Sequence, residues 1–305
     1  MIEHYSTLVM QIKSTNTLFN KLSINDDCLT VEQKNFLSEN GYLVIEPLPF
    51  FKKNLNSLNN IINKLIKEEG SNGGWEGKEK NFKEGKYFEP GCDRLGNLIE
   101  KDILFSEIIV IPEILAAAYH VIKSEIKVGG LNFRNPKKGN GEQGLHIDIF
   151  PRQKKTENFS GIVAYLYLDD SNVENGAVRI VPKSHKKLGW PDDYIDTTKR
   201  FKDEIRGEVK AGSIIIINLN TWHAGAINKS GADRKTMFLQ IKRRDEPQLL
   251  NYKKFLSENT KKQLNEEKKY LLAIRDVDTT QKEDSYSVGD HYRKIFGTDR
   301  GAIRK

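Results

Sequence analysis

The sequence predicts an α+β fold built on an antiparallel β core, and three observations carry this prediction. Six short apolar runs, separated by Gly, Asn, Asp or Pro, occupy the middle of the chain, which is typical of a sandwich or barrel. Amphipathic helical patterns precede these runs, and a charged helical pattern follows them. The composition is that of a folded chain, with 37% hydrophobic and 30% charged residues among 305.

The N-terminal part reads as helices around one strand. Residues 31–50 predict a short helix that ends at Asn40-Gly41, followed by a strand over 42–45. Apolar residues at helical spacing predict a second helix over 53–68. The apolar segment 106–122 predicts a core helix that begins near Pro112, because its acids and proline do not suit a membrane span.

The segment 70–91 is rich in glycine and charge and carries several aromatic residues. We interpret it as a lid-like loop over a ligand, the alternative being an ordinary exposed loop. The β core is expected over 126–244. Its six predicted strands are 126–135, 144–150, 161–168, 176–182, 212–219 and 235–243. The remainder, 245–305, is expected to be a helical extension with one surface helix over 253–275. We expect 1–125, 126–244 and 245–305 to form a single domain.

Charge and cysteine usage narrow the classes of partner and compartment. The formal net charge of +7 is scattered, without a dense basic block with interleaved aromatics, so we expect no nucleic-acid partner. Cys28 and Cys92 are isolated and form neither a disulfide framework nor a zinc pattern. The N-terminus does not resemble a signal peptide. These features predict a cytoplasmic protein that acts on a small molecule without a membrane, and they leave the oligomeric state open.

The run 144–150, "GLHIDIF", carries an imidazole and a carboxylate two positions apart. In a strand, His146 and Asp148 would project to one face. A polar face turned to water is one explanation. A second histidine, His223, follows the strand 212–219 and can meet the other two side chains across a barrel. Two imidazoles and one carboxylate form the ligand set of non-haem Fe(II) oxygenases.

Arg234 lies eleven positions after His223, after a turn through "NKSGAD" and at the start of the next strand. An arginine there can point into the same barrel. Its planar fork suits a carboxylate, so it can hold the far end of a 2-oxo acid chelated by iron. The alternative is an ordinary hairpin charge.

Strand parity supplies further candidates for the wall of this site. We assign Asn132 and Tyr165 to the co-substrate, and Arg134, Tyr167 and Arg179 to the substrate. Any of these side chains could instead face solvent. The arginines favour an anionic substrate, such as an amino acid or another carboxylate.

Three stretches together resemble one known family. The segments "LHIDIF", "YLYLDDSNVENGAVRIVPKSH" and "TWHAGAINKSGADR" are similar to the phytanoyl-CoA hydroxylase family of iron- and 2-oxoglutarate-dependent oxygenases, and the likeness covers roughly 33–244. The resemblance implies a double-stranded β-helix, or jelly roll, similar to the cupins. It also implies His146, Asp148 and His223 as iron ligands and Arg234 as the 2-oxoglutarate-binding arginine.

The resemblance also has departures. Gly225 stands where some relatives carry a hydroxylated residue that helps to hold the co-substrate, so another group must help here. Lys183 replaces the more usual glycine before Ser184, and His185 reads as a structural residue. Asp148 argues against halogenation, because related halogenases replace this carboxylate with alanine or glycine.

The expected function is a dioxygenase that uses Fe(II), 2-oxoglutarate and O2 to oxidise an unactivated C–H bond of a small, anionic substrate. Hydroxylation, oxidative cyclisation and desaturation are all open, with release of succinate and CO2, and natural-product biosynthesis is one setting. The alternatives are a non-catalytic metal-binding jelly roll and an oxygenase that acts on nucleic acid or protein.

Overall fold

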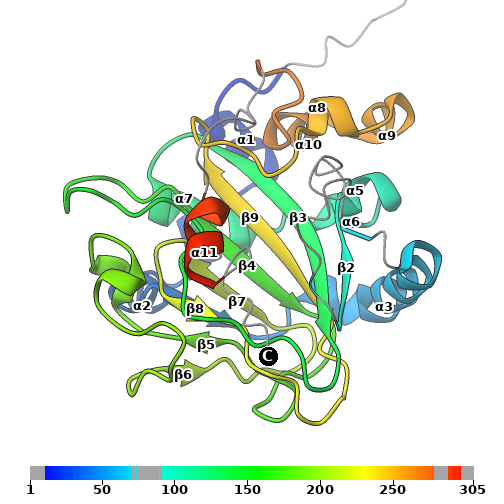
Figure 1. The fold of residues 1–305 in the computed structure, drawn as a ribbon. Coiled ribbons are helices and arrows are strands. Elements are labelled where there is room, and N and C mark those ends of the chain that lie inside the picture. The colour runs from blue at the N-terminus through cyan, green and yellow to red at the C-terminus, as the bar shows by residue number, and fades with distance from the viewer. Residues whose placement is uncertain (1–10, 71–72, 75–88, 90, 278–287, 297–305) are drawn as a thin grey trace, which may run out of the picture.

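Two antiparallel sheets form the centre of the structure (Figure 1). The computed structural model describes residues 11–70, 73–74, 89, 91–277 and 288–296. The larger sheet has six strands, in the spatial order β1 (Tyr42–Ile45), β7 (Ile214–Asn218), β4 (Gly161–Tyr167), β9 (Thr236–Arg243), β3 (Ile126–Pro136) and β2 (Cys92–Leu95). The smaller sheet has three strands, in the order β6 (Ile205–Arg206), β5 (Arg179–Ile180) and β8 (His223–Ala224).

The central strands of the larger sheet are buried on both faces. One set of alternating side chains, such as Ile162 and Ala164 of β4, packs into the core shared with the helices. The other set, such as Val163 and Tyr165, faces the smaller sheet and packs against Val178, which directly precedes β5. This period-two division explains why these strands read as continuous apolar runs.

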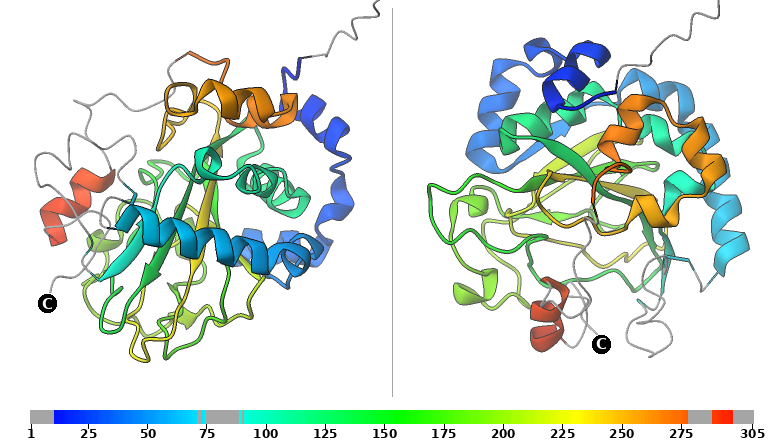
Figure 2. Two further views of the ribbon diagram at one scale, coloured as in Figure 1. Left: turned by 90° about the vertical axis from the view of Figure 1, so that its right-hand side faces the viewer. Right: turned by 90° about the horizontal axis from the view of Figure 1, so that it is seen from above.

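The N-terminal helices cover one face of the larger sheet. They are α1 (Thr15–Leu22), α2 (Val31–Asn40), α3 (Pro49–Glu69), α5 (Leu98–Lys101), α6 (Phe105–Ile108) and α7 (Pro112–Ile122), with a 3-10 turn η1 (Asp26–Cys28). Figure 2 shows α7 on this side of the sheet and α11 on the other. The predicted ends of α2 and β1 and the start of α7 at Pro112 are confirmed.

Gly41 ends α2 for a physical reason. Its φ of 77° lies in the left-handed region, and an added Cβ would stand 2.4 Å from Nδ1 of His185. Only glycine therefore fits between α2 and β1.

The segment after β9 is helical, but the predicted single helix over 253–275 is wrong. It forms α8 (Tyr252–Phe255), α9 (Glu258–Gln263) and α10 (Glu266–Leu271), and a further helix, α11 (Val288–Phe296), follows. Ser257 and Asn265 interrupt the helical pattern because each accepts a hydrogen bond as an N-cap, from the amides of Thr260 and Lys268. Leu256 and Leu264 are buried at the two breaks rather than solvated.

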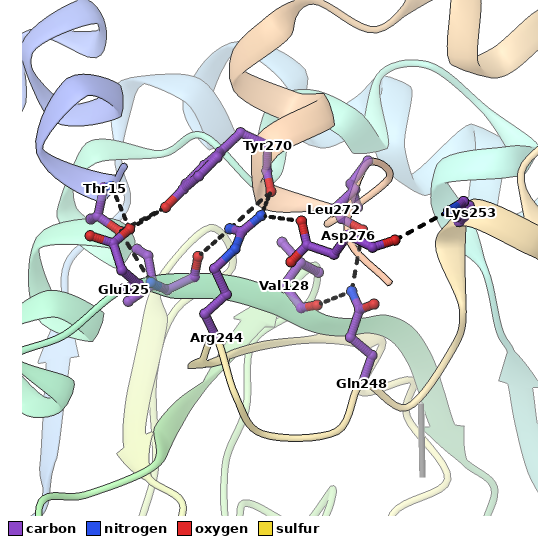
Figure 3. Close-up of polar contacts among 10 residues, drawn as sticks. Thr15, Glu125, Val128, Arg244, Gln248, Lys253, Tyr270, Leu272 and Asp276 are labelled. Carbon is purple, nitrogen blue, oxygen red and sulfur yellow. Dashed lines mark hydrogen bonds and ion pairs between the residues drawn. The ribbon is translucent and has the colours of Figure 1, made fainter. Parts of the chain in front are cut away.

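Partly buried polar contacts fasten α10 to the first helix and to the larger sheet (Figure 3). The carboxylate of Glu125 accepts hydrogen bonds from the backbone amide of Thr15, at 2.7 Å, and from the hydroxyl of Tyr270. Arg244, which follows β9, donates to the carbonyl oxygen of Tyr270 and forms an ion pair with Asp276 at 2.7 Å. The extension is thus joined to the sheet by specific bonds.

Three other expectations need correction or fall outside the structure. The run 144–150 is not a regular strand, because only His146 forms a bridge, to His223, while neighbouring amides bond to loops. The run 176–182 contributes only the two residues of β5, and short 3-10 turns, η3 (Ser184–Lys186) and η4 (Pro191–Asp193), follow it. The lid-like loop 70–91 lies mostly outside the described residues. The three-part division of the chain stays a prediction.

Candidate metal centre

Three predicted ligands meet between the two sheets. One nitrogen or oxygen atom from each of His146, Asp148 and His223 lies within 4.8 Å of the others, and no other such group of His, Cys, Asp and Glu occurs among the described residues. Nε2 of His223 is 3.7 Å from Oδ2 of Asp148. Both histidines are buried, at 3% and 1% exposure. The expectation that His146 and Asp148 share a face thus fits the geometry, although the run is not a strand.

Backbone carbonyl groups fix which nitrogen of each imidazole points to the centre. Nδ1 of His146 is 2.9 Å from the carbonyl oxygen of Gly144, and Nδ1 of His223 is 2.9 Å from that of Thr221. A carbonyl oxygen only accepts, so in a neutral imidazole Nδ1 carries the hydrogen and Nε2 keeps its lone pair. This is the arrangement that backbone partners give to metal-bound histidines.

The residues fit a divalent metal ion. Nε2 of His223 is buried and has no hydrogen-bond partner within the described part of the chain. A buried acceptor without a partner is costly, and a metal ion is the partner that a lone pair facing an imidazole and a carboxylate would take. Two imidazoles and one carboxylate leave further coordination positions for a co-substrate, as in non-haem iron sites.

A cavity opens beside this centre. Its wall includes the three predicted ligands and Arg234, together with Arg94, Asn132, Phe133, Arg134, Gln143, Val163, Tyr165, Val178, Gly225, Phe238, Gln240 and Leu249. Seven of these residues come from β3, β4 and β9, which are neighbouring strands of the larger sheet. The metal centre therefore borders a preformed cavity that can admit a small molecule.

Arg234 is a buried cation on the cavity wall, at 2% exposure. Its Nε donates to the carbonyl oxygen of Asn175 at 3.2 Å, and its backbone amide is held by the side chain of Asn135. Its Nη2 has no hydrogen-bond partner among the described residues. Burial lowers the pKa of the guanidinium, which still stays charged at neutral pH. A carboxylate of 2-oxoglutarate fits this unused donor.

A second charged group lies at the same wall. Glu89 sits between the guanidinium groups of Arg134 and Arg94, and Nε of Arg134 is 3.0 Å from Oε2 of Glu89. Burial raises the pKa of Glu89, but the two positive charges outweigh burial and hold it well below its usual range. Glu89 thus bridges the two arginines.

The other predicted wall residues divide into two sets. Asn132, Tyr165 and Arg134 line the cavity, and the ring of Tyr165 stands 6.0 Å from that of His223. Tyr167 and Arg179 do not line it. Tyr167 is wholly buried near Arg234, and burial raises its pKa to about 12. Arg179 donates to the carbonyl oxygen of Gln143 at 2.7 Å and pairs with Glu204.

Sequence reasoning did not find several of the lining residues. Phe238 and Gln240 alternate along β9, so the strand parity used for Asn132 would also have found them. Gln143 holds the amide of Gly225 through its side-chain oxygen, at 2.9 Å, and no local pattern marks it. His185 does not line the cavity, and its Nε2 donates to the carbonyl oxygen of Ser38 at 3.1 Å.

Comparison with known proteins gives both sequence and fold relatives. The sequence matches the family described as Phytanoyl-CoA dioxygenase (PhyH) over residues 37–236. It is 31% identical to "Dioxygenase aneA" of Aspergillus aculeatus over 97 residues, which cover 30% of this chain and 32% of that protein. It is 28% identical to an uncharacterized protein of Mycobacterium bovis over 121 residues, which cover 38% of this chain and 41% of that protein. The matches span about a third to two fifths of these relatives.

Solved structures of similar fold confirm the predicted jelly roll. The carbocyclase SnoK from nogalamycin biosynthesis has a TM-score of 0.55 at 19% identity, over 71% of this chain and 85% of SnoK. HygX from Streptomyces hygroscopicus, crystallised with nickel, 2-oxoglutarate and hygromycin B, has a TM-score of 0.56 at 16% identity, over 72% of this chain and 89% of HygX.

Within the described part of the chain, no helix combines the length and the apolar character that crossing a bilayer requires. The family match covers well over half of the chain and includes all three residues that meet at the candidate centre. The chain belongs to the phytanoyl-CoA dioxygenase family, whose members depend on iron and 2-oxoglutarate.

Proposed function

We propose that this protein is a 2-oxoglutarate-dependent oxygenase in which His146, Asp148 and His223 bind Fe(II). The observation that carries the proposal is the orientation of the two imidazoles. Nδ1 of each is engaged by a backbone carbonyl group, which leaves Nε2 as the nitrogen available to a metal ion, and Nε2 of His223 faces the carboxylate of Asp148. Such a site has the donor set that Fe(II) takes in oxygenases of this kind.

The remaining wall residues have distinct tasks in this proposal. When bound, iron with 2-oxoglutarate and O2 supplies an oxidant able to attack an unactivated C–H bond, with release of succinate and CO2. Arg234 binds the far carboxylate of 2-oxoglutarate through its unused Nη2. Asn132 and Tyr165 flank the co-substrate, and the apolar side chains Phe238 and Val163 exclude water.

The charge of the cavity wall supports a small, anionic substrate. Arg94, Arg134 and Arg234 place guanidinium groups on this wall, and Glu89 pairs with the first two. Positive groups on the wall favour a carboxylate or an amino-acid-like substrate. Arg179 does not contribute to this charge, since Glu204 pairs with it away from the cavity.

For the type of oxidation, the proposal includes several reaction outcomes. Proteins of similar fold include a carbocyclase and an epimerase, SnoK and SnoN, so the fold serves several outcomes of C–H oxidation. We propose hydroxylation, oxidative cyclisation or desaturation of a small molecule. SnoN and HygX were crystallised with small molecules, nogalamycin RO and hygromycin B, which supports a small-molecule substrate.

An anaerobic spectrum of the protein with Fe(II) and 2-oxoglutarate tests the proposal. We expect a weak visible band from the chelated 2-oxo acid in the wild type and none in His146→Ala. Arg234→Ala should need far more 2-oxoglutarate for the same band. His120→Ala is the control, because His120 bonds to Ser38 at 2.7 Å and does not line the cavity, so its band should match the wild type. Folded, iron-loaded wild type without a band would contradict an oxygenase and favour a non-catalytic metal-binding protein.

A further inference from the structure

The helix α11 returns to the metal centre although it lies outside the family match, which ends at residue 236. Figure 1 shows it in front of the larger sheet, near β8. Its residue Tyr292 is fully buried. The hydroxyl oxygen of Tyr292 accepts a hydrogen bond from the backbone amide of Ile147 at 2.8 Å. A residue near the end of the described chain thus touches the backbone between two predicted ligands.

The position of Ile147 makes this bond consequential. The amide of His146 donates to the carbonyl oxygen of His223 at 3.0 Å, and the amide of Asp148 donates to that of Leu219 at 2.9 Å. The amide between them is held by a side chain, that of Tyr292. Because Ile147 is buried, at 1% exposure, its amide would have no water to replace this partner.

The ring of Tyr292 also supports a predicted ligand directly. It lies edge-on to the imidazole of His146, with ring centroids 5.8 Å apart and planes at 77°. The indole of Trp190 also contacts the tyrosine ring edge-on, with centroids 5.6 Å apart. The ring therefore limits the orientations open to His146.

Neighbouring contacts fix α11 in this place. The imidazole of His291 stacks on Trp190, with ring centroids 3.6 Å apart and planes at 9°. Its Nε2 is 3.1 Å from Oδ1 of Asp192 in the turn η4. Tyr292 is thus held by the residue before it, and the hydroxyl stays aimed at Ile147.

We propose that Tyr292 is a positioning residue of the metal centre, which sets the spacing of His146 and Asp148 through the amide of Ile147. This inference rests on the proposed function, because it assigns a task toward the metal ion that these residues would bind. Partners that orient metal ligands commonly change metal affinity or activity by about 10- to 100-fold when they are removed. The metal centre would then include a segment that the family match does not contain.

Two tyrosine-to-phenylalanine variants make a matched test. Tyr292→Phe keeps the ring against His146 and removes only the hydroxyl. Tyr252→Phe is the control, because the hydroxyl of Tyr252 also accepts a hydrogen bond from a buried backbone amide, that of Leu131, at 3.0 Å. Tyr252 is buried as well and lies in α8, and it does not line the cavity. The pair separates loss of a buried hydroxyl from loss of this particular contact.

Metal affinity, amide exchange and melting temperature are measured for each protein. Binding of Ni(II), and of Fe(II) without oxygen, should weaken about tenfold in Tyr292→Phe and stay unchanged in Tyr252→Phe. Hydrogen exchange at the amide of Ile147 should speed up only in Tyr292→Phe, and exchange at Leu131 only in Tyr252→Phe. Both variants should melt at similarly lowered temperatures, since each loses one buried hydrogen bond.

Each contrary outcome points to a different failure. Wild-type metal affinity in Tyr292→Phe, or an equal loss in both variants, would overturn the positioning role. Unchanged exchange at Ile147 in Tyr292→Phe would overturn it too, since the hydroxyl would not hold that amide. A wild type that binds no metal would contradict the proposed function instead, and exchange at Ile147 would still report whether Tyr292 holds the segment.

Discussion

His146 and His223 each donate a backbone hydrogen bond to the carbonyl oxygen of the other, at 3.0 Å in both directions. They form a single antiparallel bridge, with imidazole centroids 4.5 Å apart. This pair joins the loop that carries Asp148 to the strand β8 of the smaller sheet. A metal ion bound by both side chains would therefore cross-link two distant parts of the chain.

Metal binding should consequently raise the melting temperature. At a free concentration 100 times its dissociation constant, a metal ion that binds only the folded protein adds about 2.7 kcal/mol to the free energy of unfolding. Thermal unfolding with Ni(II), and with a chelator, measures the shift. His146→Ala should show none, whereas His120→Ala should match the wild type. An equal shift in His146→Ala would mean that the metal binds elsewhere.

Arg234→Lys should raise the KM for 2-oxoglutarate by at least about tenfold with a smaller change in kcat, because lysine lacks the planar fork that matches a carboxylate. Consumption of 2-oxoglutarate at varied concentration measures both constants. Arg244→Lys is the matched control. Arg244 is a partly buried arginine paired with Asp276, so its loss should lower stability without changing KM. An unchanged KM in Arg234→Lys would remove Arg234 from the co-substrate site.

Gly225→Ser should lower the free energy of unfolding. It should not improve co-substrate binding, although it supplies the hydroxyl that some relatives carry. An added Cβ would stand 2.5 Å from the carbonyl oxygen of Gly141 and 2.8 Å from Oε1 of Gln143. The loop must shift to admit it, at a cost of about 1–3 kcal/mol. Urea unfolding and 2-oxoglutarate titration measure the effects. A variant as stable as the wild type, with tighter co-substrate binding, would contradict this reading.

The free energy of unfolding should fall as the pH drops from 7 to 5, partly through His185. Burial, with the charges of Lys186 and Arg152, lowers the pKa of His185 to about 4, although Ser38 and Glu39 oppose this. Between its ordinary pKa of about 6.5 and 4, the unfolded chain binds a proton that the folded chain does not. The contribution of His185 to the free energy of unfolding is thus fully present above pH 6.5. At pH 5 this contribution has fallen by about 2 kcal/mol.

Urea unfolding at pH 7 and pH 5 checks this dependence. His185→Gln has no titrating imidazole, so its stability should change less between the two pH values than that of the wild type. If the free energy of unfolding fell equally in the two proteins between pH 7 and pH 5, other groups would account for the loss. Buried carboxylates such as Glu89 would contribute only at lower pH, because the pKa of Glu89 is depressed.

Local patterns predicted the parts of the fold that local physics determines. The glycine at 41 and the proline at 112 fixed the end of α2 and the start of α7, and both predictions are confirmed. The predicted metal ligands came from the spacing of His146 and Asp148 and from the second histidine after a strand. Each of these signals spans only a few residues of sequence.

Long-range contacts were beyond the sequence. The predicted helix over 253–275 is broken because Ser257 and Asn265 cap new helices, and burial of Leu256 and Leu264 stabilises the breaks. Nothing near Tyr292 indicates that it bonds to Ile147, which stands 145 positions earlier. The pairing of Arg134 with Glu89 likewise depends on how the chain brings them together.

The position of α11 in the chain has a consequence for biosynthesis. Translation proceeds from the N-terminus, so His146, Asp148 and His223 are all synthesised before Tyr292. A nascent chain therefore presents the three side chains to iron before the tyrosine can close on the backbone of Ile147. Docking of α11 therefore completes the proposed metal centre only after its three ligands have been synthesised.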